Sequence, residues 1–182
     1  MSSWKIRQAV KSLNKGGVIA YPTEAIYGLG CDPFNEQALQ RLLKIKQRPW
    51  QKGLILVAAD FNQLQEFIQP VSAQILQQLE SSWPGPTTWL LPANSTIPIY
   101  LSGEHSTIAV RVTAHRQTAE LCRAFGGAIV STSANLAGMK PAKTAHQTSW
   151  QLADIDYVLP GLCSGDNNPS EIRNAQTGKK IR

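Results

Sequence analysis

The sequence predicts an α/β fold, in which helices flank a twisted sheet of mixed parallel and antiparallel strands. Segments with the 3.6-residue apolar repeat of a helix alternate along the chain with short apolar segments typical of strands. Several connections between these strands are too short for the crossover that parallel neighbours need, so some neighbouring strands must be antiparallel. With 182 residues, 42% of them hydrophobic, the chain is expected to form a single domain spanning residues 1–182.

Glycine, proline and helix-capping residues delimit the elements of the first half. A helical repeat stops at Gly16-Gly17, and a short apolar strand ends at Pro22. Asn35, Asp60 and Ser72 each stand where a side chain can cap a helix. The predicted elements are a helix at 4–15, a strand at 18–21, a glycine-rich loop at 23–33, a helix beginning after 35, a strand at 54–58, and short helices after 60 and 72.

In the second half, the segment 107–113 alternates strictly between apolar and other residues. Ile108, Val110 and Val112 form one apolar face, which leaves Arg111 and Thr107 on the other. We therefore expect one side of this strand to face the core and the other to be available for a ligand. The remaining elements are a break at 83–86, a strand at 87–91, a helix at 115–125, a strand at 128–131, a weaker helix at 144–152, and thirty loop-rich residues at the end.

A cluster of cations follows the predicted second helix. Between Arg41 and Lys52 the chain carries five basic residues and no acid. Pro49 disfavours helical geometry at Arg48, and extended residues two apart point the same way, so that Lys46 and Arg48 are expected to aim at one anionic ligand. The alternative is a solvated face at the end of a helix, which is common for such runs.

A second polar cluster follows the apolar run 128–130. Ser131, Ser133 and Asn135 share one face if the strand continues through them. Two hydroxyls and an amide supply both donors and acceptors, which suits a small ligand with several polar groups. An ordinary turn after a strand uses the same residue types and is the competing interpretation.

Composition and motifs exclude several other chemistries. A formal charge of +6 and a pI near 9.4 favour acidic partners such as nucleotides or RNA. There is no P-loop, no complete GxGxxG motif, no GxSxG elbow and no carboxylate pair suited to glycoside chemistry.

Neither a membrane span nor a secretory signal is apparent, so the chain is expected to be cytoplasmic. The spacing of the cysteines and histidines argues against a disulfide framework or a protein-bound metal, and these residues are Cys31, Cys122, Cys163, His105, His115 and His146.

Six motifs follow one another along nearly the whole chain. They are 17–24 (GVIAYPTE), 27–30 (YGLG), 46–49 (KQRP), 83–87 (WPGPT), 109–112 (AVRV) and 131–135 (STSAN). By these motifs and their order the chain resembles the YrdC/TsaC family of threonylcarbamoyl-AMP synthases, and its length suggests the short, single-domain bacterial form. Ala25 and Lys52-Gly53 depart from the usual pattern of the family.

The resemblance implies a YrdC-like fold with a basic concave groove, and an enzyme that forms L-threonylcarbamoyladenylate and pyrophosphate from L-threonine, bicarbonate and ATP. That product feeds the threonylcarbamoyladenosine modification of tRNA through downstream transfer proteins. Mg²⁺ is expected to arrive with ATP and bridge its phosphate oxygens without a dedicated protein site. The implied nucleotide-binding residues are Lys46, Arg48, Lys52, Thr107, Ser133 and Asn135, with Lys46 and Arg48 catalytic. The implied residues around threonine and its carbamate are Thr23, Arg111, Ser131 and Ser170.

Each of these assignments has a structural alternative. Arg111 could be a strand residue paired with an acid, and Thr23 could merely stabilise the bend after Pro22. The competing function is an RNA-binding module for double-stranded or structured RNA that does not turn over ATP. A third function, carbamoyl transfer in metallocentre maturation, uses a similar domain in larger proteins, but this chain lacks their zinc-finger cysteines and acylphosphatase-like sequence.

Overall fold

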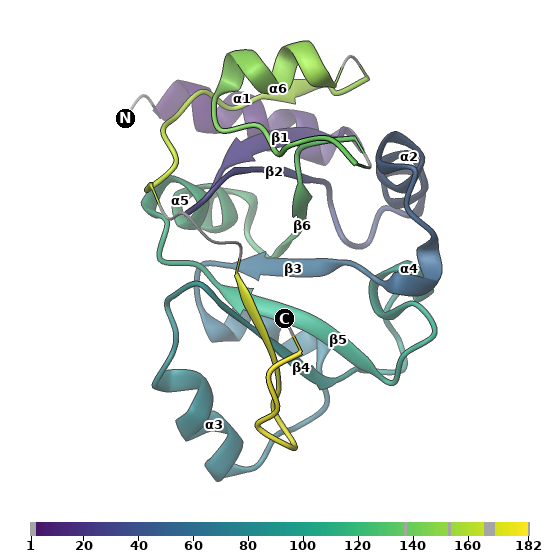
Figure 1. Ribbon diagram of the computed structural model, residues 1–182, viewed down its shortest axis with the longest axis vertical. Helices are drawn as coiled ribbons and strands as arrows, with labels where there is room; N and C mark the ends of the chain where they lie inside the picture. The colour runs from purple at the N-terminus through teal and green to yellow at the C-terminus, as the bar shows by residue number, and fades with distance from the viewer. Residues whose placement is uncertain (1–2, 137, 153, 166–169, 182) are drawn as a thin grey trace.

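The strands of the protein join in one mixed sheet. The computed structural model describes residues 3–136, 138–152, 154–165 and 170–181. Within these ranges the sheet has eight strands in the order β7-β1-β2-β6-β3-β5-β4-β8 (Figure 1). This arrangement confirms the predicted α/β class with mixed strand directions. The strands are β1 (Ile19–Pro22), β2 (Tyr27–Gly30), β3 (Ile55–Ala58), β4 (Thr87–Pro92), β5 (Thr107–Val112), β6 (Ile129–Ser133), β7 (Tyr157–Val158) and β8 (Glu171–Asn174).

The centre of the sheet brings distant parts of the sequence into register. β6 runs antiparallel to both β2 and β3, whereas β3 and β5 are parallel. Ile55 of β3 lies opposite Ser131 of β6 on one side and Ala109 of β5 on the other. Since paired residues share a face of the sheet, the serines of β6 and the non-core face of β5 come to lie on the same side.

Among the described residues, five of the helical segments begin at a residue whose side chain caps them. Asn35 Oδ1 accepts a hydrogen bond from Ala38 N at 2.9 Å, and Ser72 Oγ accepts one from Ile75 N at 3.3 Å. The α-helices are α1 (Ser3–Asn14), α2 (Glu36–Lys46), α3 (Ala73–Glu80), α4 (Ile99–Ser102), α5 (Arg116–Phe125) and α6 (Ala145–Gln151), and the 3₁₀ segments are η1 (Trp50–Lys52) and η2 (Phe61–Phe67). The capped segments are α2, η2, α3, α5 and α6.

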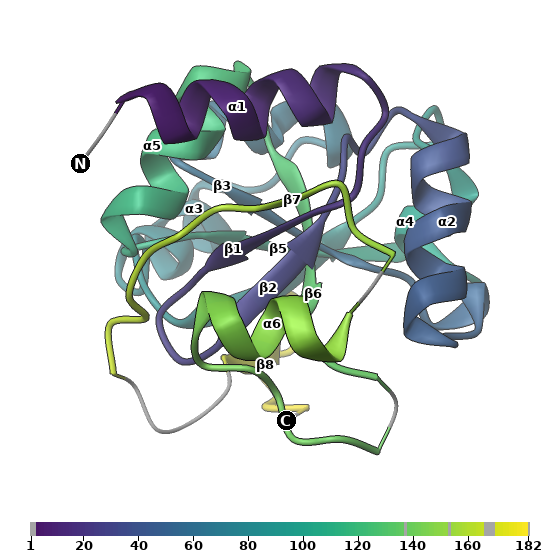
Figure 2. The ribbon, with the colours of Figure 1, turned by 90° about the horizontal axis from the view of Figure 1, so that it is seen from above.

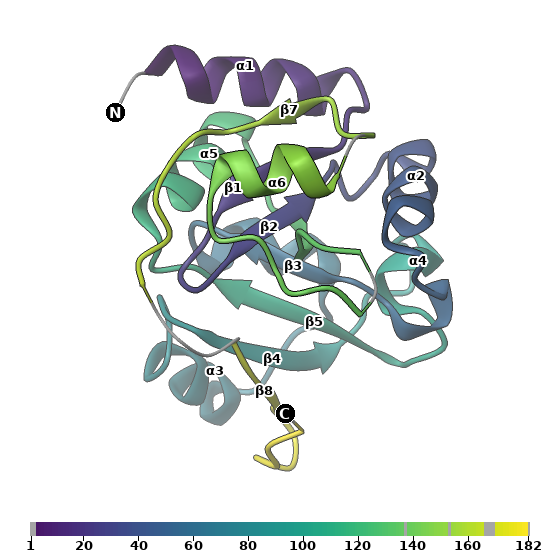
Figure 3. The ribbon, with the colours of Figure 1, turned by 45° about the horizontal axis from the view of Figure 1, so that its top comes forward.

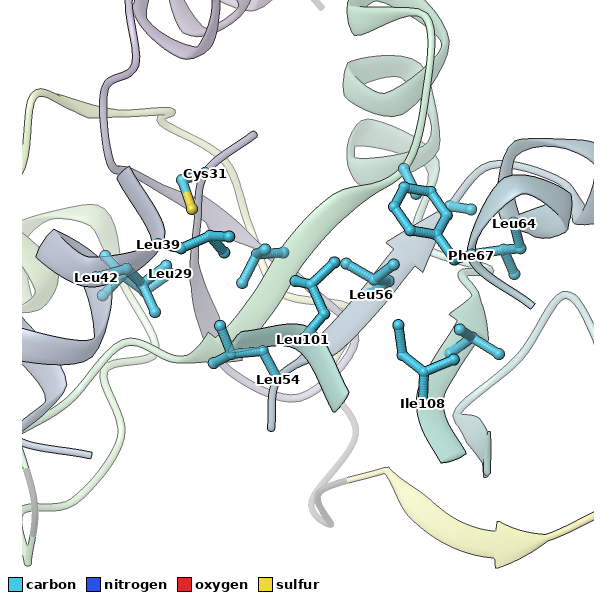
Figure 4. Packing of buried hydrophobic residues seen from close by; sticks show 14 of the residues in the cluster. Leu29, Cys31, Leu39, Leu42, Leu54, Leu56, Leu64, Phe67, Leu101 and Ile108 are labelled. Atoms are coloured by element: carbon cyan, nitrogen blue, oxygen red, sulfur yellow. The ribbon is translucent and has the colours of Figure 1, made fainter. Parts of the chain in front are cut away.

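Apolar side chains pack on both faces of the sheet. On one face, Leu56 belongs to a cluster of buried side chains that extends from Leu42 of α2 to Phe67 of η2 (Figure 4). On the other, Val57 and Ile129 pack under α1 and α5, two helices that contact each other and lie side by side in Figure 2. This alternation along β3 and β6 is the period-two burial expected of strands covered on both sides.

The covering of the second face is incomplete, and this positions the site. Along β6, Ile129 lies in the core beneath α5, whereas Ser131 and Ser133, on the same side of the strand, line a cleft. Likewise Val57 of β3 is in the core and Ile55 lines the cleft. The part of this face that α1 and α5 do not cover therefore forms the floor of the cleft.

Some predicted elements differ from the observed ones. The segment predicted as a glycine-rich loop at 23–33 contains β2, which pairs with β1 and β6. The helix after Asp60 is a 3₁₀ helix, α4 follows Pro98 where no element was predicted, and the loop-rich end contains β8, which runs parallel to β4. The two strands among them, β2 and β8, are short and exist because of their partners in the sheet, and their own sequences carry little periodicity.

Among the residues that the structure describes, no helix combines the length and the apolar character that a membrane span requires.

Candidate active site

A cleft of about 1280 Å³ opens over the centre of the sheet. Its floor is formed by residues of β3, β5 and β6, and its walls include residues of α6 and β8, which lie on opposite sides of that region in Figure 3. Eight of the ten residues predicted to contact ligand line this cleft. They are Thr23, Arg48, Lys52, Thr107, Arg111, Ser131, Ser133 and Ser170.

The other two predicted residues, Lys46 and Asn135, lie directly behind the lining. Lys46 Nζ donates to the carbonyl oxygen of Ser133 at 2.6 Å and to Asn135 Oδ1 at 3.0 Å, and it also contacts the carbonyl oxygen of Asn135. One ammonium group thus joins the end of α2 to the segment after β6, across 87 residues of sequence. The two clusters found in the sequence are in direct contact.

The geometry of the first cluster differs from the expected one. Lys46 belongs to the last turn of α2, and Gln47 closes the helix in the left-handed conformation, with φ of 48° and ψ of 41°. The expectation that Lys46 and Arg48 are extended residues two apart is therefore wrong. The chain reverses at the helix cap instead, and the two cations separate, so that Lys46 points to the β6 end while Arg48 lines the cleft.

Burial changes the acid–base behaviour of Lys46. The residue is 7% exposed, and burial lowers the pKa of its ammonium group to about 8, with a smaller contribution from the positive charge of Arg48. A substantial fraction of this lysine is therefore neutral slightly above physiological pH when no ligand is bound.

Arg48 is held against the backbone of the segment that follows it. Its Nε and Nη2 donate to the carbonyl oxygen of Gly53 at 3.2 and 3.0 Å, and Nη2 also contacts the carbonyl oxygen of Lys52 at 3.3 Å. Gly53 has a φ of 60°, a conformation that glycine adopts readily. The unusual Lys52-Gly53 step thus supplies the carbonyl that orients Arg48.

The residues of the second cluster, Ser131, Ser133 and Asn135, lie partly in strand β6 and partly in the loop that follows it. Ser131 and Ser133 both lie in β6 on the cleft side, as the predicted continuation of the strand requires. Asn135 lies beyond the strand, and its Nδ2 donates to the carbonyl oxygens of Leu136 and Met139 at 3.0 and 2.6 Å. Asn135 therefore shapes the loop next to the cleft and binds Lys46, and it does not line the cleft in this structure.

Arg111 is buried on the cleft side of β5, where the alternating pattern placed it. It is 7% exposed, and its Nη2 lies 3.4 Å from Glu24 Oε2. The alternative in which Arg111 pairs with an acid thus describes a real contact, but the pair lies in the cleft and not on the surface.

Glu24 is the residue of this site that sequence analysis missed. It lines the cleft and is 5% exposed. Burial by itself would raise the pKa of Glu24, but the charge of Arg111 and the hydrogen bond from Thr113 outweigh it and hold the pKa below its ordinary value. The signal available in the sequence was an acid directly after Pro22-Thr23 at the end of a buried strand.

The remaining residues border the cleft through local contacts. Thr23 Oγ1 donates to the carbonyl oxygen of Ile26 at 2.7 Å, so it also stabilises the bend after β1. Thr88 Oγ1 donates to Ser170 Oγ at 3.2 Å, which attaches the start of β8 to β4.

The described residues offer little to a resident metal ion. They contain no group of three or more His, Cys, Asp or Glu side chains that could hold one. Among the cysteines, Cys31 and Cys122 are buried and Cys163 is half-buried, and all three are free. The lining residues include five cations, namely Arg48, Lys52, Arg111, Lys140 and Lys143, and one acid, Glu24.

Comparisons with curated proteins extend over the whole chain. The chain is 50% identical over 181 residues to the threonylcarbamoyl-AMP synthase of Nitrosococcus oceani, covering 99% of this chain and 98% of the relative. It is 46% identical over 183 residues to the threonylcarbamoyl-AMP synthase of Hahella chejuensis, covering 100% of each.

Solved structures share the architecture. P. abyssi Sua5 in complex with L-threonine aligns with a TM-score of 0.92 at 29% identity, covering 99% of this chain, which spans 53% of the longer protein. E. coli YciO aligns with a TM-score of 0.83 at 26% identity, covering 95% of this chain and 84% of YciO. The sequence model of the Sua5/YciO/YrdC family, described as "Telomere recombination", matches residues 11–182. The chain belongs to the Sua5/YciO/YrdC family.

Proposed function

We propose that this chain is an L-threonylcarbamoyladenylate synthase, a nucleotidyltransferase that makes threonylcarbamoyl-AMP and pyrophosphate from L-threonine, bicarbonate and ATP. The observation that carries the proposal is the meeting of the cationic segment 46–52 with the hydroxyl groups of β6 and with Arg111 around one cleft. Relatives that match over nearly their full length, with about half of the aligned residues identical, are named threonylcarbamoyl-AMP synthases, which supports the proposal.

The chemistry requires a site of this composition. The amine of threonine reacts with bicarbonate to form a carbamate with loss of water, and an oxygen of this carbamate attacks the α-phosphorus of ATP while the bond to pyrophosphate breaks. Such a displacement needs no protein nucleophile, but it needs the anions to be held together and the charge on the phosphoryl oxygens to be stabilised. Arg48 and Lys52 line the cleft where they could contact the triphosphate, and Lys46 places a third charge behind Ser133.

The amino-acid end is assigned to the opposite part of the floor. Arg111 offers a planar fork that matches a carboxylate, with Thr23, Ser131 and Ser170 around it. The complex of P. abyssi Sua5 with L-threonine supports an amino-acid site in this fold. Thr107, Ser133 and Asn135 complete the proposed nucleotide side.

Mg²⁺ is proposed to arrive with ATP. The lining contains hydroxyls and cations, and Glu24, its one acid among the described residues, already faces Arg111 and Thr113. Such a lining fits a metal carried on the triphosphate, where it would neutralise phosphate charge.

We further propose that the product is consumed by cytoplasmic proteins that transfer its threonylcarbamoyl group to tRNA. A mixed anhydride of a carbamate and a phosphate is an activated acyl donor, and a separate transfer step must use it before water does. Contact of this chain with tRNA is part of this proposal, because its net charge of +6 favours polyanions.

The test is an assay with pure protein, ATP, Mg²⁺, L-threonine and labelled bicarbonate. We expect pyrophosphate release that depends on threonine, together with a labelled adenylate. Tight, salt-sensitive RNA binding without either product would support the RNA-binding module instead.

A further inference from the structure

The contacts of Glu24 suggest a function that the proposed chemistry does not yet include. Glu24 lines the cleft, yet its carboxylate faces inward, with Oε1 and Oε2 bound to different parts of the chain. Burying a carboxylate costs several kcal/mol unless it is paired and hydrogen-bonded. Glu24 meets both conditions, and its partners are the backbone after β5 and an arginine that lines the cleft.

One oxygen of Glu24 is fixed firmly. Oε1 accepts a hydrogen bond from Thr113 Oγ1 at 2.6 Å and one from the backbone N–H of Ala114 at 3.1 Å. Thr113 Oγ1 in turn accepts from the backbone N–H of His115 at 3.1 Å. The carboxylate is therefore anchored to the turn between β5 and α5, and its orientation does not depend on Arg111.

The other oxygen is held loosely. Oε2 lies 3.4 Å from Arg111 Nη2, which is an ion pair without a hydrogen bond, and it has no hydrogen-bond partner among the described residues. Arg111 Nε is likewise buried without a partner. The guanidinium thus has its charge compensated by Glu24, while no hydrogen bond from it to the carboxylate uses up its donors.

We propose that Glu24 is a positioning residue, which keeps the guanidinium of Arg111 in the orientation that receives the carboxylate of the amino-acid substrate. The inference rests on the proposed function, because it needs an amino acid at Arg111. A bidentate arginine–carboxylate contact depends on how the guanidinium is placed, and the anchored negative charge of Glu24, 3.4 Å from Nη2, attracts that end of the group toward one position. Without Glu24, a buried arginine is left unpaired and turns toward other acceptors.

A competing electrostatic effect has the opposite sign. Glu24 also repels the substrate carboxylate, so that removing its charge could strengthen binding. Two variants separate orientation from charge. Glu24→Asp keeps the charge but shortens the side chain by one methylene, whereas Glu24→Gln keeps the length and removes the charge.

The experiment measures KM for L-threonine and for ATP, together with kcat, in both variants. We expect each variant to raise KM for threonine about tenfold, with KM for ATP within about twofold of wild type. Glu120→Gln is the matched control, because it breaks an ion pair with Arg116 on α5 and does not line the cleft. A loss of stability alone lowers the folded fraction and so raises KM for both substrates together, whereas the proposal requires a rise in KM for threonine only.

L-Threoninamide has the amine and the hydroxyl of threonine but no carboxylate. The preference of the enzyme for threonine over this amide is a measurement that should not change if Glu24 only supports the fold. Wild type should prefer threonine strongly, and Glu24→Gln and Arg111→Lys should each reduce that preference. The double variant should lose no more than Arg111→Lys alone, because Glu24 acts through Arg111. Threonine KM values that stay unchanged or fall in both Glu24 variants overturn the proposal.

Should the Glu24 variants not fold, Thr113→Val provides the same test. It removes the hydroxyl that holds Oε1, keeps the shape of the side chain, and lies outside the residues that line the cleft. We expect KM for threonine to rise severalfold, and an unchanged value overturns the proposal. A wild-type enzyme that makes no adenylate refutes the proposed function, whereas an active wild type with unaffected variants refutes this inference alone.

Discussion

Lys46 and Arg48 leave the end of one helix for different surroundings. Lys46 gives its N–H groups to oxygens of Ser133 and Asn135, whereas Arg48 binds the carbonyl oxygen of Gly53 at the cleft. Lys46 therefore both assembles the site and charges it, while Arg48 can act on a ligand without supporting the fold. The two residues call for different tests.

Replacing Arg48 tests its contact with the nucleotide. Arg48→Ala should lower adenylate formation about 100-fold or more, because a charged contact to phosphate is worth several kcal/mol and each 1.4 kcal/mol is a factor of ten. The free energy of unfolding should fall by only about 1 kcal/mol, since a partly exposed side chain loses its bonds to backbone carbonyls. Pyrophosphate release and urea unfolding measure the two effects. Lys44→Ala, on the exposed face of the same helix, is the control, and unchanged turnover in Arg48→Ala would remove Arg48 from the site.

The lowered pKa of Lys46 predicts a pH dependence. With a pKa of about 8 in the folded protein, Lys46 loses its proton above pH 8, and KM for ATP should rise about fivefold between pH 8 and pH 9. Lys46→Arg should give a flat profile over that range, because arginine does not titrate there. A flat wild-type profile would contradict the role of Lys46.

The lowered pKa of Lys46 also makes the free energy of unfolding depend on pH. The unfolded chain holds the lysine proton up to about pH 10.4, and therefore binds more protons than the folded one between about pH 8 and 10.4. The contribution of Lys46 to the free energy of unfolding thus rises with pH across that window, and ligand binding there should take up a proton.

Strand β2 shows why some elements escape sequence analysis. Its four residues include Gly28 and Gly30, which have low strand propensity, so the segment was predicted to be a loop. The strand exists because β1 and β6 pair with it on both sides. The glycines are needed for close approach, since a Cβ at Gly28 would lie 3.2 Å from the ring of Tyr21 and one at Gly30 would overlap the carbonyl oxygen of Val130.

That packing predicts the effect of one added methyl group. Gly30→Ala should lower the free energy of unfolding by several kcal/mol, because the backbone of β6 cannot move away without breaking the sheet. Gly127→Ala is the matched control: a Cβ there meets nothing within 4 Å, and little change is expected. Urea unfolding of both variants measures the difference. Equal stability in the two would show that β2 and β6 are less tightly packed than this structure indicates.

Elements with strong apolar periodicity were predicted well, because their sequence and their packing agree. The helix after Asn35 begins with the predicted cap, and the alternation along the strand at 107–113 places Arg111 on the cleft side. The end of the helix that follows Asn35, α2, was predicted wrongly. The left-handed conformation of Gln47 is uncommon for a residue other than glycine and leaves no signal in the sequence.

At the scale of the whole molecule, the site is a product of the topology. Residues near 24, 48, 111 and 131 meet because β6 lies between β2 and β3, and β3 lies beside β5. Motifs in the sequence identified most of the residues that line the cleft among those predicted, but the pairing of Glu24 with Arg111 was not predicted. The organisation of residues 1–182 as a single domain remains a prediction, as do the roles of the individual site residues.

A site assembled from distant segments should stabilise the whole chain when it is filled. ATP with Mg²⁺, at about 100 times its dissociation constant and without threonine, should contribute about 2.7 kcal/mol. For a chain of this length this corresponds to a rise in Tm of about 5–10 °C. Thermal unfolding monitored by circular dichroism measures the shift. Arg48→Ala should lose most of it at the same ATP concentration, and Lys44→Ala should retain it. An equal shift in wild type and Arg48→Ala would mean that ATP binds elsewhere, because the cation that lines the cleft beside Gly53 would then not contribute to binding.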